Sequence, residues 1–105
     1  MQQRGLAEMS SYLVIDTEVI DEDAFSEFAV KIYDAVIARG GTFLVRGSDL
    51  DVIEGDWTPQ RLVIMSFDSD DGAAEFVRST QYTALDELRL RAVRSSVVVA
   101  AGFKG

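Results

Sequence analysis

The stretch that decides the fold is SYLVIDTEVIDEDAFSEFAVKIYDAVIARGGTFLVRG, residues 11–47. It opens with β-branched and aromatic residues, and we expect a strand over residues 12–18. Apolar residues then recur at three- and four-residue spacing, with acids before the run and Gly40-Gly41 after it. This pattern predicts a helix over residues 22–39. TFLVRG then returns to an extended pattern, so the order is strand, helix, strand.

The second half of the chain continues this alternation. RLVIMSF, residues 61–67, is the best candidate for a central strand because its apolar run is nearly continuous. We expect a helix from Ser69 with acids in its first turn, a break around residues 79–81, a further helical stretch over residues 82–93, and a last strand in SSVVVAAGF. The predicted fold is therefore α+β and ferredoxin-like, a βαββαβ chain that forms a four-stranded antiparallel sheet with helices on one face. The other face needs a partner unless it is very polar.

The segment between the two halves has a weaker pattern. DVIEG, residues 51–55, follows TFLVRG and Gly47-Ser48-Asp49, and we expect either one bent strand with a bulge or a small hairpin. DWTPQ, which holds the only proline and the only tryptophan, is expected to be a loop. A chain of 105 residues supports one core. We therefore expect a single domain over residues 11–103, after a disordered N-terminal extension over residues 1–10.

Composition excludes several classes of function. The chain has no cysteine and no histidine, which excludes disulfides, thiolate nucleophiles, zinc fingers, axial-histidine haem and Ser-His-Asp triads. A net charge of -8 repels phosphate backbones and anionic lipids, so neither nucleic acid nor a membrane is an expected partner. No apolar run approaches the ~20 residues that cross a bilayer, and no signal-peptide core is present. We expect a cytoplasmic protein.

The acidic clusters do not have the spacing of a metal site. DSDDG, residues 68–72, resembles a calcium loop, but counted from Asp68 its glycine falls at position five instead of six and Ser79 stands where glutamate is needed. Acids at the start of a helix explain the cluster better. Gly40-Gly41 follows a helix instead of opening one, and no dinucleotide fingerprint exists. We therefore expect neither a metal nor a cofactor.

Three arginines are candidates for binding an anion. Arg46, Arg61 and Arg89 stand at element ends among apolar or aromatic residues, where they can converge on a carboxylate. The alternatives are structural. Arg46 or Arg61 can pair with Glu54 across neighbouring strands, and Arg89 lies toward a helix C-terminus, where a cation complements the helix dipole.

The remaining candidates are one carboxylate and two aromatic side chains. Tyr82, seven residues before Arg89, shares its flank if the last helix runs without a break. Glu54 as base and Tyr82 as acid would suffice for proton transfer on an enolisable substrate, although a tyrosine at a helix start commonly only covers the rim of a core. Trp57 is a candidate ligand contact, but a lid over the sheet end or an interface anchor is the better interpretation.

GGTFLVRGSDLDVIEGDWTPQRLVIMSF, residues 40–67, and AAEFVRSTQYTAL, residues 73–85, resemble the DUF1330 family, within the dimeric α/β barrel superfamily. The shared pattern is G-G-x-F/Y-L-x-R-G, then E-G, an aromatic residue, P-x-R, and later S-x-x-Y. The positions that match its polar residues are Arg46, Gly47, Glu54, Gly55, Arg61 and Tyr82, with Trp57 at the aromatic position. The resemblance implies a ferredoxin-like subunit whose sheet packs against a second copy to form a homodimer.

The resemblance does not bring a reaction with it, and three functions stay open. The first is a homodimer that binds a small, carboxylated organic molecule in a cleft between sheet and helices, with Arg46 and Arg61 on the anion and Tyr82 as hydrogen-bond donor. The second is a cofactor-independent enzyme of the proton-transfer, isomerase or monooxygenase type. The third is a structural or interaction module, which predicts a filled interior.

Overall fold

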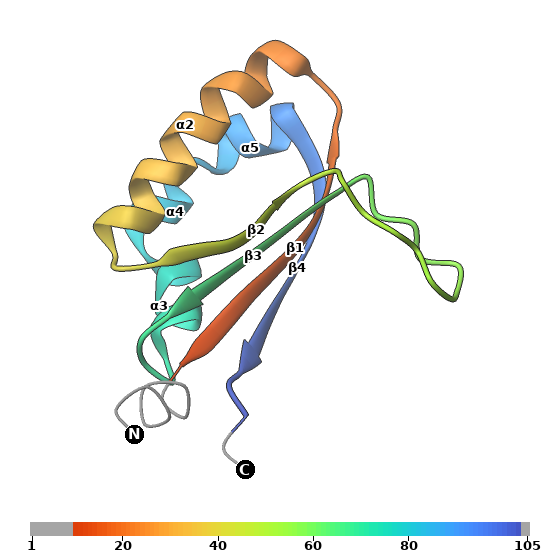
Figure 1. Cartoon of the computed structure of the whole chain (residues 1–105). Helices are drawn as coiled ribbons and strands as arrows, with labels where there is room; N and C mark the ends of the chain where they lie inside the picture. Colours follow the sequence, from red (N-terminus) through yellow and green to blue (C-terminus); the bar gives the residue numbers. More distant parts are fainter. Residues whose placement is uncertain (1–9, 104–105) are drawn as a thin grey trace.

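The computed structural model describes residues 10–103, and the four strands and the main helix expected from the sequence are present in it. The strands form one antiparallel sheet in the order β2-β3-β1-β4, and the helices lie on one of its faces (Figure 1). The expected ferredoxin-like arrangement is confirmed. The strands are β1 (Ser11–Val19), β2 (Thr42–Gly47), β3 (Arg61–Phe67) and β4 (Val93–Ala101), and the helices are α2 (Glu22–Ala38), α3 (Gly72–Arg78), α4 (Thr80–Thr83) and α5 (Asp86–Ala92).

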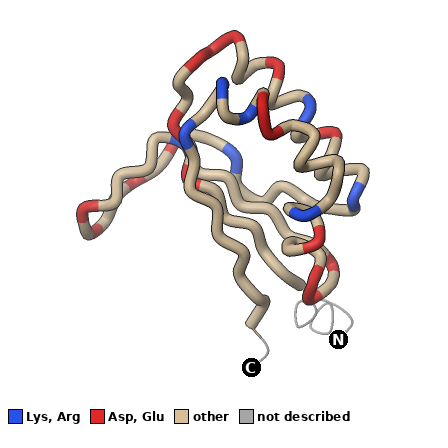
Figure 2. The backbone as a smooth tube through the Cα atoms, turned by 180° about the vertical axis from the view of Figure 1, so that it is seen from behind, with Lys and Arg blue, Asp and Glu red and all other residues tan. Residues whose placement is uncertain are grey.

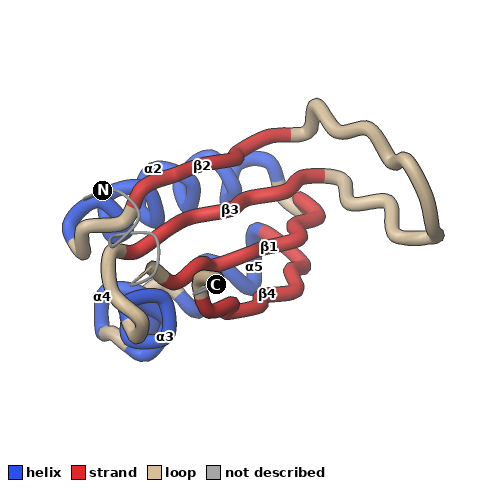
Figure 3. The backbone as a smooth tube through the Cα atoms, turned by 60° about the horizontal axis from the view of Figure 1, so that its bottom comes forward, coloured by secondary structure: helices blue, strands red, loops and turns tan. Residues whose placement is uncertain are grey.

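The two faces of the sheet follow from the alternation of side chains along each strand. On the face toward the helices, Leu13 of β1 lies opposite Met65 of β3, and both side chains are buried with Phe76 of α3 in one core cluster. On the opposite face, Val14 lies between Ile64 and Val98. No helix of residues 10–103 covers this second face, as Figure 3 shows. We call it the outer face; its apolar residues are Tyr12, Val14, Val45, Leu62, Ile64, Val98 and Ala100.

The main helix, α2, begins at the expected residue and ends one residue earlier than expected. The side chain of Asp21 accepts a hydrogen bond from the Ala24 N–H at 2.9 Å, which satisfies one of the free donors at the helix N-terminus. Gly40 follows the helix with a φ of 79°, a conformation that favours glycine. The Gly41 N–H then donates to the Val36 carbonyl at 2.9 Å. The acidic start and the glycine end therefore act as the sequence predicts.

The segment between β2 and β3 differs from both expected forms. DVIEG is neither a bent continuation of β2 nor a hairpin strand, and residues 48–60 form a loop that projects from the body of the domain (Figure 1). The only irregularity in the pairing of β2 with β3 falls earlier, between Phe43 and Val45. Val52, Ile53 and Trp57 are exposed, so the loop has few apolar contacts within its own chain with which to form a strand.

The helices of the second half also differ from the prediction. α3 begins at Gly72 instead of Ser69, so Asp70 and Asp71, the acids expected in its first turn, precede the helix, and the acid of the first turn is Glu75. Asp71 at the N-cap makes no side-chain cap hydrogen bond. Ser11 of β1 supplies the cap hydrogen bond instead. Its buried hydroxyl accepts from the Ala73 N–H at 3.0 Å and donates to the Ser69 carbonyl at 2.7 Å. The break near residues 79–81 is present. The expected helix over residues 82–93 is two short helices, α4 and α5.

The described residues near the two ends of the chain can be compared with the expected limits of the domain. The extension over residues 1–9 lies outside the described residues. Ser10 is buried, and its carbonyl accepts a hydrogen bond from the Gly102 N–H at 2.9 Å, so this residue belongs to the folded domain. Among the described residues, no helix is long and apolar enough to cross a membrane.

Candidate functional site

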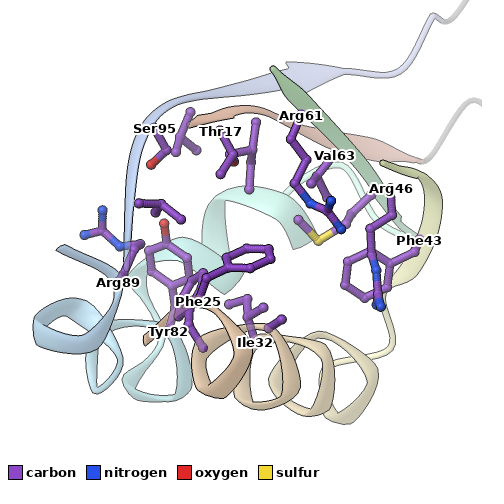
Figure 4. Close-up of a pocket in the computed structure, with 16 residues that line it drawn as sticks. Thr17, Phe25, Ile32, Phe43, Arg46, Arg61, Val63, Tyr82, Arg89 and Ser95 are labelled. Atoms are coloured by element: carbon purple, nitrogen blue, oxygen red, sulfur yellow. The ribbon is translucent and has the colours of Figure 1, made fainter. Parts of the chain in front are cut away.

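A cavity lies between α2 and the face of the sheet that carries the helices (Figure 4). Its volume is about 60 Å³, and it is open to solvent on one side. At roughly 10–15 Å³ for each water molecule, this is room for a few waters or a small organic group. Phe28 and Ile32 of α2 form part of its apolar wall, opposite Val63 and Met65 of β3.

Charged residues of the four strands gather at one end of the sheet, and strand alternation distributes them between its two faces. Figure 2 shows this end, from which the loop projects. Arg61 lies opposite Thr17, which faces the helices, and Arg46 lies opposite Val63, which does the same. Asp16, one position from Thr17, therefore lies on the outer face. Arg94 of β4, like Glu18 opposite it, also lies on the outer face. The cavity consequently receives arginines but no carboxylate. Its charged lining residues are Arg46, Arg61 and Arg89.

Arg46 and Arg61 are held by aromatic rings instead of by acids. The Arg61 guanidinium carbon lies 5.2 Å from the centre of the Phe25 ring. The Arg46 guanidinium carbon lies 5.4 Å from the ring centres of both Tyr33 and Phe43. Neither arginine forms an ion pair within residues 10–103. Stacking on a ring orients a guanidinium and leaves its N–H groups free to bind an anion.

Tyr82 and Arg89 lie at the other side of the cavity (Figure 4). The Tyr82 side chain is only 9% exposed, and the Arg89 guanidinium carbon lies 5.7 Å from its ring centre. The reason we expected for this proximity, an uninterrupted helix, is wrong. Two backbone hydrogen bonds instead link Tyr82 to Arg89 across the break between α4 and α5. The Leu85 N–H donates to the Tyr82 carbonyl at 3.0 Å, and the Arg89 N–H donates to the Leu85 carbonyl at 2.8 Å.

The electrostatics of this second side differ from those of the first. Arg89 pairs with Asp86 at 3.2 Å, so its charge already has a partner, while its buried Nε atom has no hydrogen-bond acceptor among the described residues. Burial raises the pKa of the Tyr82 phenol; Arg89 opposes this shift and Asp86 adds to it. Since its pKa lies above the ordinary 10.0, Tyr82 is protonated at neutral pH and able to donate a hydrogen bond.

Two of the predicted site residues lie outside the cavity. Glu54 is exposed in the loop over residues 48–60 and pairs with neither Arg46 nor Arg61, so the expected cross-strand pair is absent. Trp57 is 58% exposed, and its indole N–H donates to the Asp16 carboxylate at 2.7 Å. Because Asp16 lies on the outer face, this bond holds the indole away from the cavity.

Two hydroxyl residues that were not among the predicted site residues, Thr17 and Ser95, also line the cavity. They lie opposite one another on β1 and β4, and Thr17 is also opposite Arg61 on β3. These three side chains form one polar row across the sheet. Alternation along SYLVIDTEV was the available signal, because Thr17 falls on the same face as Leu13 and Ile15. Ser95 gave no comparable signal, since its face depends on a register that only the folded sheet fixes.

Comparison with known proteins places the chain in a family. The sequence model described as "Domain of unknown function (DUF1330)" matches residues 10–103. The chain belongs to the DUF1330 family. No curated protein shows significant similarity to this DUF1330 chain.

Solved structures share the fold of this DUF1330 domain at low sequence identity. A protein of unknown function from Rhodopseudomonas palustris is 15% identical, with a TM-score of 0.71 over 93% of this chain and 85% of its own. A conserved protein from Methanosarcina mazei is 8% identical, with a TM-score of 0.58 over 98% and 100%. SnoaB, a cofactor-independent oxygenase from Streptomyces nogalater, is 10% identical, with a TM-score of 0.57 over 92% and 96%. At these identities the likeness shows the fold alone.

Proposed function

We propose that this DUF1330 protein is a homodimer that binds a small carboxylated organic molecule in the cavity between α2 and the sheet. The observation that carries the proposal is the sign of the cavity charges. In a chain with a net charge of -8, the cavity is lined by three arginines and by no acid. Arg46 and Arg61 lack a carboxylate partner within residues 10–103, and a ligand carboxylate would supply one.

Benzoate is a suitable probe, because it joins one carboxylate to a flat apolar body. We expect isothermal titration calorimetry to detect benzoate binding, and we expect Arg46→Ala and Arg61→Ala each to weaken it by roughly tenfold to a hundredfold. Arg78→Ala is the matched control, since it removes the same charge from an exposed residue that does not line the cavity. Equal affinity in all three variants and the wild type would contradict the proposal.

The outer face supports the homodimer. Its central row, Val14 between Ile64 and Val98, is apolar, and the side chain of Val98 is 57% exposed in the single chain. An apolar sheet face is stable in water only when another layer covers it, and a second copy of the same face is the simplest such layer. The loop over residues 48–60 projects beyond one end of the sheet (Figure 1). Its exposed apolar residues, Ile53 above all, add to the surface that a partner would cover.

Cofactor-independent catalysis on the same ligand is the second candidate function. The observation that favours it is the protonated Tyr82 phenol at the cavity wall, which is placed to act as a proton donor. Glu54 does not support the role of base that we expected, because it lies in the exposed loop outside the cavity of its own chain. A bound ligand that is converted by the wild type and bound but not converted by Tyr82→Phe would support this function; conversion at an equal rate by both proteins would contradict it.

The structural module is the least supported function. It predicts a filled interior, whereas the region between α2 and the sheet holds an open cavity. It also gives no reason for two arginines without acidic partners to be placed at the same cavity.

A further inference from the structure

Two largely buried residues that line the cavity, Tyr82 and Thr17, carry hydroxyls that lack partners in the described part of the chain. Tyr82 is 9% exposed and Thr17 is 6% exposed, and both line the cavity. Neither side-chain oxygen forms a hydrogen bond with any residue in the range 10–103. These oxygen atoms are not themselves buried, because the only buried side-chain nitrogen or oxygen without a partner among the described residues is Arg89 Nε. Each hydroxyl can therefore bond to water or to a ligand in the cavity. The cavity is the space from which a partner can reach both hydroxyls.

The two sides of the cavity differ in charge. On one side, Arg61 extends from the sheet into the cavity beside Arg46, and neither has an acidic partner in the described part of the chain (Figure 4). On the other side, Arg89 already pairs with Asp86 but keeps one buried Nε donor without an acceptor among residues 10–103, and the remaining polar groups are the neutral hydroxyls of Tyr82 and Ser95. The Thr17 hydroxyl lies on the sheet between Arg61 and Ser95. The first side is suited to an anion. The second is suited to an oxygen that carries no charge.

The wall between Arg61 and Tyr82 is apolar on the helix side, while Thr17 lies on the sheet side. The Phe25 ring lies between Arg61 and Tyr82 in Figure 4, and Ile32 and Val63 complete the wall there. A ligand that reaches both polar sides must therefore carry an apolar body between its two polar groups, because polar atoms in the middle would lose their hydration without gaining a partner.

We propose that the ligand is a small acid with an uncharged oxygen group, a hydroxyl or a carbonyl, at the end opposite its carboxylate. This inference rests on the proposed function, because it places the carboxylate at Arg46 and Arg61. It adds that Tyr82 and Thr17 bind the second group and so select among carboxylates. A hydroxyl or carbonyl accepts from the Tyr82 O–H, and Ser95 and Thr17 each donate or accept as the ligand requires.

The test compares the affinities of four probes by titration calorimetry: benzoate, 3-hydroxybenzoate, 4-hydroxybenzoate and terephthalate. We expect one of the two hydroxybenzoates to bind roughly fivefold to tenfold more tightly than benzoate, the gain of one well-placed hydrogen bond. Terephthalate, with a second charge and no unpaired cation to meet it, is expected to bind no more tightly than benzoate.

Two conservative variants test which residues cause the tighter binding of the hydroxybenzoate. Tyr82→Phe and Thr17→Val keep the volume of the side chain and remove its hydroxyl. Each is expected to reduce the preference for the hydroxybenzoate and to leave benzoate affinity within about twofold of the wild type. Tyr12→Phe is the control, since it removes a phenol from the outer face, away from the cavity. Both binding variants keep the ring or methyl contacts of the cavity wall, and circular dichroism checks that they fold.

The outcomes separate this inference from the proposed function. If benzoate binding depends on Arg61 but neither hydroxybenzoate binds more tightly, or if the preference survives in both hydroxyl variants, the inference is overturned and the proposed function stands. If terephthalate is the tightest of the four, the second group is charged and the inference is overturned. If none of the four probes binds, the proposed function and the inference both fail.

Discussion

Tyr82 combines a largely buried phenol ring with a neighbouring arginine, and this pair contributes to how the folded state responds to alkaline pH. Its ring contacts Phe76 edge-on at 5.4 Å between ring centres, so the side chain belongs to the core at one edge and to the cavity at the other. Burial disfavours the charged phenolate, and this effect outweighs the stabilising charge of Arg89. The net result is a pKa above the ordinary value.

The raised pKa of Tyr82 predicts a loss of stability at high pH. Between the ordinary value of 10.0 and the raised value, the folded state binds more protons than the unfolded state. The free energy of unfolding is therefore unaffected by this group below that window and falls as the pH rises through it, by at most about 1.4 kcal/mol for each pH unit. Urea unfolding at pH 8 and above pH 10 should show a larger loss for the wild type than for Tyr82→Phe. Equal losses would contradict the assignment, and Tyr12→Phe should behave like the wild type.

At the scale of elements, β1 and α3 are joined by one buried serine. Ser11 is fully buried, and its hydroxyl both caps the N-terminus of α3 through Ala73 and binds the Ser69 carbonyl. Because the side chain of Asp71, the N-cap residue of α3, makes no cap hydrogen bond, a residue of a distant strand supplies one at the start of this helix.

Replacing Ser11 with alanine should therefore weaken the domain. The change leaves the Ala73 N–H and the Ser69 carbonyl without their partner, which costs about 1–3 kcal/mol in a buried site. Urea unfolding monitored by circular dichroism measures the loss. Ser96→Ala, at an exposed serine of β4, should stay within about 0.5 kcal/mol of the wild type. A similar small effect at Ser11 would show that the cap contributes little.

The elements that the sequence predicted well are those with a strong local period. The 3.6-residue pattern of α2 lies between a capping acid and a left-handed glycine, and the apolar run of β3 has the expected bounds. The start of α3 was placed wrongly because its cap comes from Ser11, 62 positions before Ala73, and no local pattern records that contact. The loop was misjudged because DVIEG resembles a strand locally but has no strand beside it.

The same distinction applies to the site. Arg46, Arg61 and Arg89 were chosen for their position at element ends and Tyr82 for its spacing from Arg89, and all four line the cavity. Glu54 and Trp57 were chosen together with them from one stretch of sequence, yet the loop carries both away from the cavity. The place of the indole is fixed by its bond to Asp16, 41 positions away.

At the scale of the whole molecule, the domain has two layers, a sheet and a layer of helices, and the sheet is covered on one face only. The helices protect the inner face of the sheet, while the outer face and the loop over residues 48–60 leave apolar side chains in solvent, among them Val98, Trp57 and Ile53, the last at 89% exposure. A homodimer formed through the outer faces would convert this exposed surface into a second core. It would leave the cavity open, because the cavity lies on the other face of the sheet.

The proposed dimer is tested by placing one charge on the outer face. Native mass spectrometry of the wild type should give twice the 11.6 kDa chain mass. Val98→Lys should give the chain mass alone, because each copy would bury an ammonium group in an apolar interface without an acidic partner. Val30→Lys is the matched control: Val30 is 63% exposed on α2 in the helical layer, close to the 57% of Val98, so the same substitution there should leave the dimer intact. A wild-type monomer, or a Val98→Lys dimer as stable as the wild type, would show that the outer face is not the interface. Benzoate binding by a folded Val98→Lys monomer would in turn show that each cavity is complete within one chain.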